Sequence, residues 1–95
     1  MLMAILSFKC SDTESLFKGQ RAKRFVNIQS VAMRKLAMLN RVATLNDLRV
    51  PPGIHLKALS GKRKGRHSIR INDQWRVCFV WTEQGPTHIE IVDYH

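Results

Sequence analysis

Hydrophobic residues recur with a helical spacing in the first half of the chain. Between residues 25 and 40 they fall every three or four positions, which is one face of an amphipathic helix. This stripe contains Phe25, Ile28, Val31, Ala32, Leu36 and Leu39, and Arg34, Lys35 and Arg41 fall outside it. We therefore expect a helix over residues 25–40 that covers a core with one face.

Two shorter helical segments flank this helix. Ser11 followed by Glu14 is a capping-box signature, which predicts a short helix that ends at Gly19. Residues 43–48 are compatible with a further helical turn, which the Pro-Pro-Gly run at 51–53 would stop.

The spacing of hydrophobic residues changes to two in the second half, which predicts strands. We expect strands at 55–59, 67–72, 75–82 and 87–93, besides a short one at 4–9. In the third of the later strands, Trp75, Val77, Phe79 and Trp81 share one face, and Arg76, Cys78 and Val80 share the other. With turn residues at 72–74 and 83–86, the pattern predicts an α+β fold: a largely antiparallel meander with two N-terminal helices packed on one face.

Size and composition limit the class of protein. With 95 residues the chain is expected to form a single domain, 1–95, and no apolar run approaches the roughly 20 residues that span a membrane. No signal peptide is evident, and two cysteines are too few for a disulfide framework or a metal site, so we expect a cytoplasmic protein without a membrane partner. A net charge of +9 favours a polyanionic partner.

Basic residues concentrate between positions 41 and 76, where nine Lys or Arg stand against two acids. Part of this run falls in a predicted loop between two strands, where long cationic side chains could reach phosphates. The candidate RNA-binding residues here are Lys62, Arg63, Lys64, Arg66 and His67. A solvated loop without a partner explains the same run about equally well.

Arg70 and Arg76 lie on either side of the turn at 72–74. On neighbouring antiparallel strands they could share one face, with no acid expected beside them. Two guanidinium groups aimed at one site suit the charge that develops on phosphate during transfer. Surface decoration is the competing interpretation.

The last three residues are Asp93, Tyr94 and His95, and they follow an apolar alternation that should dock them onto the sheet. An imidazole can pass a proton near neutral pH, and a phenol can stack on a base. An ordinary polar chain end is about as compatible with these three residues. No HExxH, CxxC, paired carboxylates or Gly-rich phosphate loop is present, so we expect neither a metal nor a cofactor.

Several segments together resemble one family. They are Leu56-Lys57-Ala58-Leu59-Ser60-Gly61, Gly65-Arg66-His67-Ser68-Ile69-Arg70, Trp75-Arg76-Val77-Cys78-Phe79 and Val92-Asp93-Tyr94-His95. As a set they resemble HigB-type toxins of the RelE/ParE superfamily, closest to the HigB/GraT kind, over almost the whole chain. The resemblance implies a fold like that of microbial ribonucleases and metal-independent cleavage of messenger RNA in the ribosomal A site.

The same resemblance assigns residue roles. Attack by the 2′-hydroxyl of RNA on the adjacent phosphate would use His95 for proton transfer, with Tyr94 and Asp93 beside it and Arg76 stabilising phosphate charge. Lys57 falls where some HigB proteins carry a histidine, so we expect it to act through charge rather than as a base. Arg70 and the loop of Lys62 to Arg66 extend this site as an RNA or ribosomal RNA grip.

The resemblance also implies partners: a cognate helix-turn-helix antitoxin of the HigA type, the 70S ribosome with its messenger RNA, and operator DNA only indirectly through the antitoxin. Two other functions remain open at this point. One is a basic nucleic-acid-binding module without catalysis, and the other is a ParE-like toxin that acts on DNA gyrase.

Overall fold

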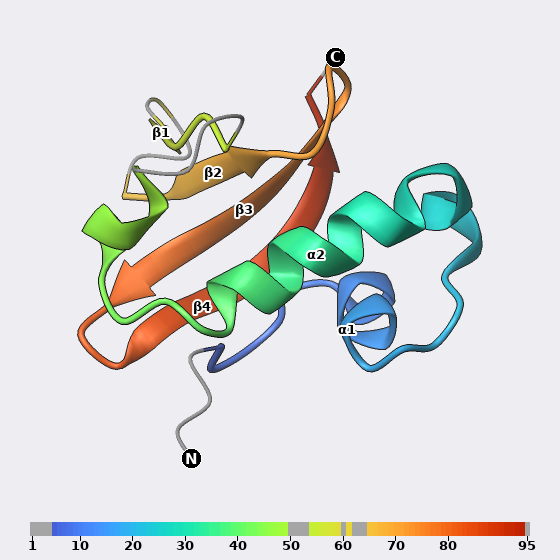
Figure 1. Cartoon of the computed structure of the whole chain (residues 1–95), viewed down its shortest axis with the longest axis horizontal. Helices are drawn as coiled ribbons and strands as arrows, with labels where there is room; N and C mark the ends of the chain where they lie inside the picture. The colour runs from blue at the N-terminus through green and yellow to red at the C-terminus, as the bar shows by residue number, and fades with distance from the viewer. Residues whose placement is uncertain (1–4, 50–53, 60, 62–64, 95) are drawn as a thin grey trace.

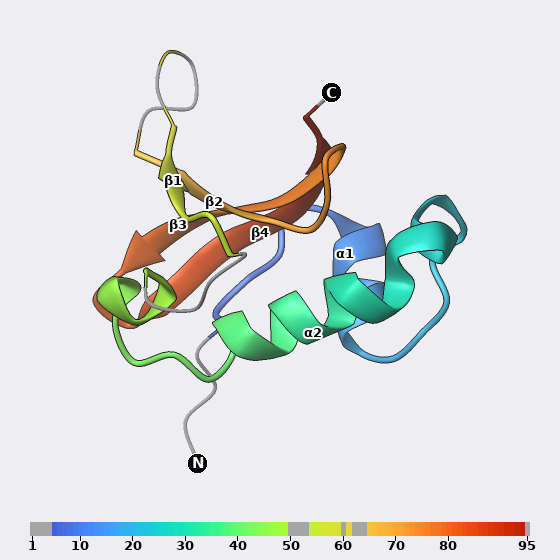
Figure 2. The same cartoon turned by 45° about the horizontal axis from the view of Figure 1, so that its top comes forward.

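A computed structural model describes residues 5–49, 54–59, 61 and 65–94. Its elements are α1 (Ser11–Phe17), the 3-10 helix η1 (Lys23–Ile28), α2 (Gln29–Leu39), the 3-10 helix η2 (Leu45–Leu48), β1 (Lys57–Ala58), β2 (His67–Arg70), β3 (Trp75–Thr82) and β4 (Gly85–Asp93). The strands pair antiparallel in the order β1-β2-β3-β4 (Figure 1). Both α-helices lie on the same side of the sheet (Figure 2), which confirms the expected α+β fold.

The core forms between the helices and one face of the sheet. Its fully buried members include Phe25 and Leu36 from the helical half and Phe79 from β3. All four residues predicted for one face of β3 belong to this core or pack against it. A buried hydroxyl also joins the two layers, since the Thr13 Oγ1 of α1 accepts a hydrogen bond from the Ile91 N–H of β4 at 3.1 Å.

The first helix ends where the sequence predicts and begins differently. Gly19 has φ +84°, and the Gly19 and Gln20 N–H groups donate to Leu16 O and Ser15 O at 3.1 and 2.8 Å, a Schellman motif. The capping box expected at Ser11 is wrong, because the N-cap is Cys10 and no side chain caps the helix. Ser11 is already the first helical residue, so its hydroxyl is not at the capping position.

A capping box is instead present at η2, the further turn predicted over 43–48. The Asp47 N–H donates to Thr44 Oγ1 at 3.3 Å, and the Thr44 N–H donates to Asp47 Oδ2 at 3.0 Å. The long helix expected over 25–40 also differs, since its first turn is the 3-10 helix η1 and α2 begins only at Gln29. The apolar stripe nevertheless faces the core, with Val31 partly buried and the other five positions buried.

The second and third strands follow their predictions closely. β3 has the expected bounds of 75–82, and β2 ends at Arg70 rather than at residue 72. The chain turns after Arg70 because Asn72 Oδ1 accepts hydrogen bonds from the N–H groups of Gln74 and Trp75, each at 2.8 Å. The fourth strand begins at Gly85, two residues earlier than expected.

The strands expected at 55–59 and 4–9 are shorter or missing. β1 has only two residues, because His55 has φ +50° and interrupts the extended chain before it. Residue 4 lies outside the described residues, and 5–9 make only one parallel bridge, Phe8 to Ile89, beside β4. His88, beside this segment in β4, has φ +55°.

Candidate functional site

Arg70 and Arg76 lie directly opposite each other in the β2–β3 pair. Directly opposed residues of antiparallel strands project from the same face, so both guanidinium groups lie on the face away from the core residues Ile69 and Val77. Lys57 of β1 lies opposite Ser68, two residues before Arg70, and therefore belongs to the same face. The sheet thus brings together three cations that are far apart in the sequence.

The side chain of Arg76 is held in place by three oxygen contacts. Its Nε donates to Ser68 Oγ at 2.7 Å, and its Nη2 donates to the His55 carbonyl at 2.5 Å and lies 3.5 Å from the Ser68 carbonyl. The Tyr94 ring centroid is 5.9 Å from Arg76 Cζ, within range of a cation–π contact. Partial burial lowers the pKa of Arg76, but a guanidinium stays charged in proteins. Arg76 is therefore a fixed positive charge.

An open depression of about 570 Å³ lies beside this arginine. Its lining is His55, Leu56, Lys57, Arg70, Asp73 and Arg76. The expectation that no acid lies near the two arginines is wrong, because the Asp73 carboxylate in the β2–β3 turn pairs with Arg70 Nη2. Asp73 is 97% exposed in this pair, so solvent weakens the interaction and an anionic ligand could compete for Arg70.

The end of β4 is docked beside the same depression. The Tyr94 N–H donates to Gln74 O at 2.6 Å, and Gln74 Nε2 donates to Asp93 Oδ2 at 3.0 Å. The β2–β3 turn therefore positions Asp93 and Tyr94, and the Tyr94 side chain is left 40% exposed near Arg76. His95 lies outside the described residues.

The expected basic loop is only partly described, since Lys62, Arg63 and Lys64 lie outside the described residues. Arg66 Nη1 is 3.7 Å from Glu90 Oε1, and its side chain is only 20% exposed. His67 faces the core side of the sheet, where its ring stacks on Phe79 with centroids 6.2 Å apart. Neither Arg66 nor His67 lines the depression at Arg76.

His67 is also electrostatically disfavoured as a cation. Burial lowers the pKa of His67, and the nearby positive charge of Arg49 lowers it further. Its Nδ1 atom is buried and has no hydrogen-bond partner among the described residues. The imidazole is therefore held in its neutral form over a wider pH range than an exposed histidine.

Sequence reasoning missed His55, which it treated as a partly exposed strand residue. The structure places His55 at the rim of the depression, and its backbone carbonyl orients Arg76. Any residue supplies a carbonyl, so a contact of this kind leaves no signal in the side-chain pattern. The unusual feature of His55 is its positive φ, which is seen in the structure and not in the sequence.

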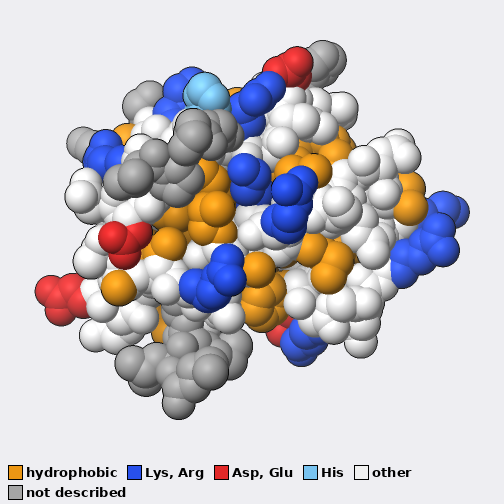
Figure 3. Space-filling view, in the orientation of Figure 1, with side chains coloured by type: hydrophobic (Ala, Val, Ile, Leu, Met, Phe, Trp, Pro, Cys, Tyr) orange, Lys and Arg blue, Asp and Glu red, His pale blue; other side chains and the backbone are white. Residues whose placement is uncertain are grey.

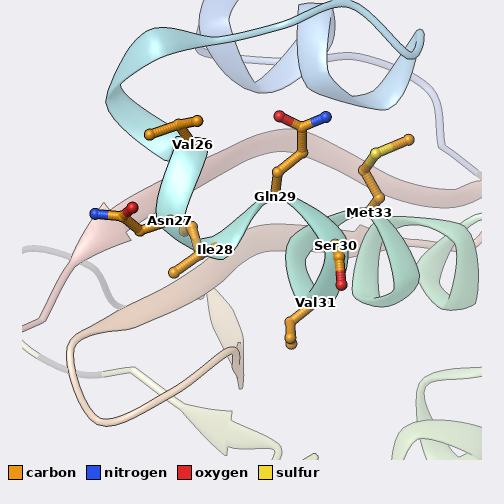
Figure 4. A pocket seen from close by; sticks show the side chains of 7 residues that line it. All are labelled: Val26, Asn27, Ile28, Gln29, Ser30, Val31 and Met33. Carbon is orange, nitrogen blue, oxygen red and sulfur yellow. The ribbon is translucent and has the colours of Figure 1, made fainter.

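A second pocket, of about 350 Å³, lies where η1 joins α2 (Figure 4). It is lined by Val26, Asn27, Ile28, Gln29, Ser30, Val31 and Met33, none of which is charged. This end of α2 is remote from β1 (Figure 1), so the pocket and the cationic depression are separate. An uncharged lining offers nothing that would attract or activate a phosphate.

Among residues 5–49, 54–59, 61 and 65–94, no three His, Cys, Asp or Glu side chains gather in a way that could hold a metal ion. Within the same residues, no helix has the length and apolar character needed to cross a membrane.

The chain is similar to known proteins over most of its length. A family model described as the RelE-like toxin of type II toxin-antitoxin system HigB matches residues 6–95. The chain belongs to this HigB-like toxin family. Membership makes it a toxin of a toxin-antitoxin system and implies an antitoxin as its partner.

Individual relatives agree with the HigB-like family. Toxin HigB-1 from Vibrio cholerae serotype O1 is 35% identical over 80 residues, which cover 82% of this chain and 84% of that protein. An uncharacterized protein from Haemophilus influenzae is 42% identical over 55 residues, 58% of this chain and 54% of that one. The crystal structure of YafQ from E. coli superposes with a TM-score of 0.63 at 14% identity, covering 95% of this chain and 91% of YafQ, which supports the fold.

Proposed function

We propose that this HigB-like toxin is a ribosome-dependent endoribonuclease that cleaves messenger RNA in the ribosomal A site without a metal and so inhibits translation in the cytoplasm. The observation that carries the proposal is Arg76, fixed by Ser68 and the His55 carbonyl at the edge of an open, cationic depression. Ribosome dependence and metal independence come from the family resemblance.

The cleavage would proceed by attack of the 2′-hydroxyl oxygen on the adjacent phosphorus. The phosphorus–O5′ bond breaks, the 2′-hydroxyl proton passes to a base, and the leaving 5′-oxygen takes up a proton. Charge builds up on the phosphate oxygens in the transition state, and preorganised cations stabilise it. Arg76 supplies the fixed charge, while Lys57 and Arg70 line the same depression and add to its field.

Proton transfer falls to the residues at the end of β4. We assign it to His95, with Tyr94 stacking on a base and Asp93 beside them. The docking of Asp93 and Tyr94 through Gln74 supports this assignment, because it anchors the chain immediately before His95 next to Arg76. Lys57 acts through its charge.

The wider interface includes the basic loop and the partner proteins. Lys62, Arg63, Lys64, Arg66 and His67 form the proposed grip on RNA or ribosomal RNA. Arg66 would first have to release Glu90, so its contribution is expected to be the smallest of the cations. The antitoxin is proposed to be a HigA-type helix-turn-helix protein, through which the pair contacts operator DNA.

Replacing Arg76 tests the proposal most directly. Arg76→Ala removes the fixed charge, and loss of one preorganised transition-state donor typically slows a reaction about 10²- to 10³-fold. Arg76→Lys keeps a charge but loses the forked contacts to Ser68 and His55, so it should recover only part of the rate. The measurement is single-turnover cleavage of a messenger on programmed 70S ribosomes, together with growth arrest in cells lacking the antitoxin.

Arg21→Ala is the matched control, since Arg21 is exposed in the segment between α1 and η1. It should cut at the wild-type rate. A messenger with a 2′-deoxy nucleotide at the cut position should resist the wild type. Equal cleavage by wild type and Arg76→Ala would contradict the assignment, cleavage of free RNA would contradict ribosome dependence, and growth arrest through DNA gyrase would identify a ParE-like target instead.

A further inference from the structure

The outer surface of α2 carries a group of cations that the proposed site does not use. Arg34, Lys35 and Arg41 rim a shallow depression of about 260 Å³ whose remaining lining is Ala37 and Met38. Arg34 and Lys35 lie on α2, and Arg41 follows the end of the helix by two residues. Figure 3 shows Lys and Arg side chains over α2 and between α2 and the sheet, with no acidic side chain between them on this face.

Ordinary explanations for helix cations do not account for this group. Among the described residues, no acidic side chain forms an ion pair with Arg34, Lys35 or Arg41. No Asp or Glu occurs anywhere in Gln29–Leu39, so an i,i+4 pair within the helix is not available. The last turn of α2 has no basic residue, so Arg34 and Lys35 are not placed to offset the helix dipole, whereas Arg41, two residues beyond the helix, is.

These cations are also close to the depression at Arg76. Burial lowers the pKa of Lys35, and the positive charges of Arg34 and of Arg70 lower it further. Arg70 lines the depression that contains Arg76. Lys35 is therefore within electrostatic range of Arg70, whose charge is partly offset by the exposed Asp73, whereas Arg34, Lys35 and Arg41 have no ion-pair partner among the described residues.

We infer that Arg34, Lys35 and Arg41 form a second binding surface, the α2 basic surface, for phosphates of an RNA backbone that continues from the site at Arg76. This inference rests on the proposed function, because that function places RNA at Arg70 and Arg76. A backbone that follows the cations from Arg70 to Lys35 and Arg34 would relieve their repulsion with phosphates and release counterions. The backbone can belong to the messenger or to ribosomal RNA.

A pair of double variants separates this surface from the general effect of charge. Arg34→Gln/Lys35→Gln removes two charges from the α2 basic surface, and glutamine keeps a high helix propensity. Arg21→Gln/Lys23→Gln removes one exposed Arg just before η1 and one exposed Lys at the first residue of η1. Both variants lower the net charge from +9 to 9 − 2 = +7, so any difference between them reports position rather than total charge. Unchanged thermal unfolding establishes that each variant is folded.

Binding is measured without cleavage, on two probes and over a range of salt concentrations. One probe is a fully 2′-O-methylated RNA oligonucleotide, and the other is a 70S ribosome without messenger. Losing two single-strand phosphate contacts should weaken binding by about tenfold near 0.15 M salt and reduce the slope of log K against log salt by about 1.4. Weaker binding to the oligonucleotide would indicate that the α2 basic surface contacts the messenger backbone. Weaker binding to the empty ribosome would indicate that it contacts ribosomal RNA.

The inference fails if the two double variants bind both probes equally, or if Arg34→Gln/Lys35→Gln weakens only the complex with the antitoxin, which would assign the surface to an acidic protein. The proposed nuclease fails separately. If the wild type cleaves no messenger yet the two variants differ in salt slope, the α2 basic surface stands as an RNA-binding surface and the catalytic assignment does not.

Discussion

At the scale of single residues, the site depends on contacts that hold Arg76 rather than on Arg76 alone. Ser68 is fully buried, and its hydroxyl has a polar partner in Arg76 Nε at 2.7 Å. Arg76 itself is readily found in the sequence because a lone cation in an apolar strand is conspicuous. Ser68 and the His55 carbonyl cannot be recognised in the sequence in the same way, because serines and backbone oxygens are ordinary components of strands and loops.

Ser68→Ala should therefore slow cleavage without a matching loss of stability. Misplacing a group that stabilises the transition state by a fraction of an ångström to 1 Å costs up to roughly 100-fold in rate. Single-turnover cleavage measures the rate, and urea unfolding measures the stability. Ser68 is a positioning residue, so its removal should matter far less when Arg76 is already Lys. Equal losses in the wild-type and Arg76→Lys backgrounds would show that Ser68 acts independently of Arg76.

His67 makes the stability of the protein depend on pH. Its pKa in the folded protein lies below the usual value of 6.5, first because of burial and then because of Arg49. The unfolded chain then binds the proton more readily, so stability is fully present above pH 6.5 and falls as the pH drops through the lowered folded pKa. His67→Gln should flatten the decrease in unfolding free energy between pH 7.5 and pH 5, measured by urea unfolding. The exposed His88→Gln serves as the control, and it should keep the wild-type decrease.

At the scale of elements, the pattern of apolar residues predicted the strands that pack on the core and failed where local geometry decides. β3 has its predicted bounds because the four alternating apolar residues predicted for one face all belong to the core or pack against it. β1 is shorter than predicted because a positive φ at His55 has no counterpart in the apolar pattern. The capping box was assigned to Ser11 instead of Thr44 because the Ser/Thr-x-x-acid pattern is common, and only the structure shows which one begins a helix.

Substituting Gly19, in the turn that ends α1, should lower the stability of the fold. Its φ of +84° is unfavourable for residues with a Cβ, although a Cβ built there meets no atom within 4 Å. Gly19→Ala should thus destabilise the fold through the backbone alone, by about 1–2 kcal/mol. Gly19→Asn should cost less, because asparagine tolerates this conformation better. Urea unfolding compares the two variants, and an alanine variant as stable as the wild type would contradict the Schellman ending of α1.

At the scale of the whole molecule, the net charge of +9 favours a polyanionic partner but does not indicate where such a partner would bind. The described acids are paired unevenly: Glu90 lies near Lys9 and Arg66, while the cations of α2 have no such neighbour among the described residues. The net charge does not show which charges are paired, because pairing depends on the register of β4 and the packing of α2. The sequence therefore predicts the types of residue in the candidate site, but the extent of the site over the surface can be described only from the fold.

The hydrogen bonds of Arg76 also restrict how a phosphate can approach it. A guanidinium has five N–H groups, and here the Nε–H is directed at Ser68 and one Nη2–H at the His55 carbonyl. The lateral edge that would bind an anion through Nε and Nη2 together is thus occupied. Nη2 also lies 3.5 Å from the Ser68 carbonyl, so a phosphate would have to meet Arg76 end-on, chiefly through Nη1. This would orient the nucleotide by approach direction rather than by recognition of its base.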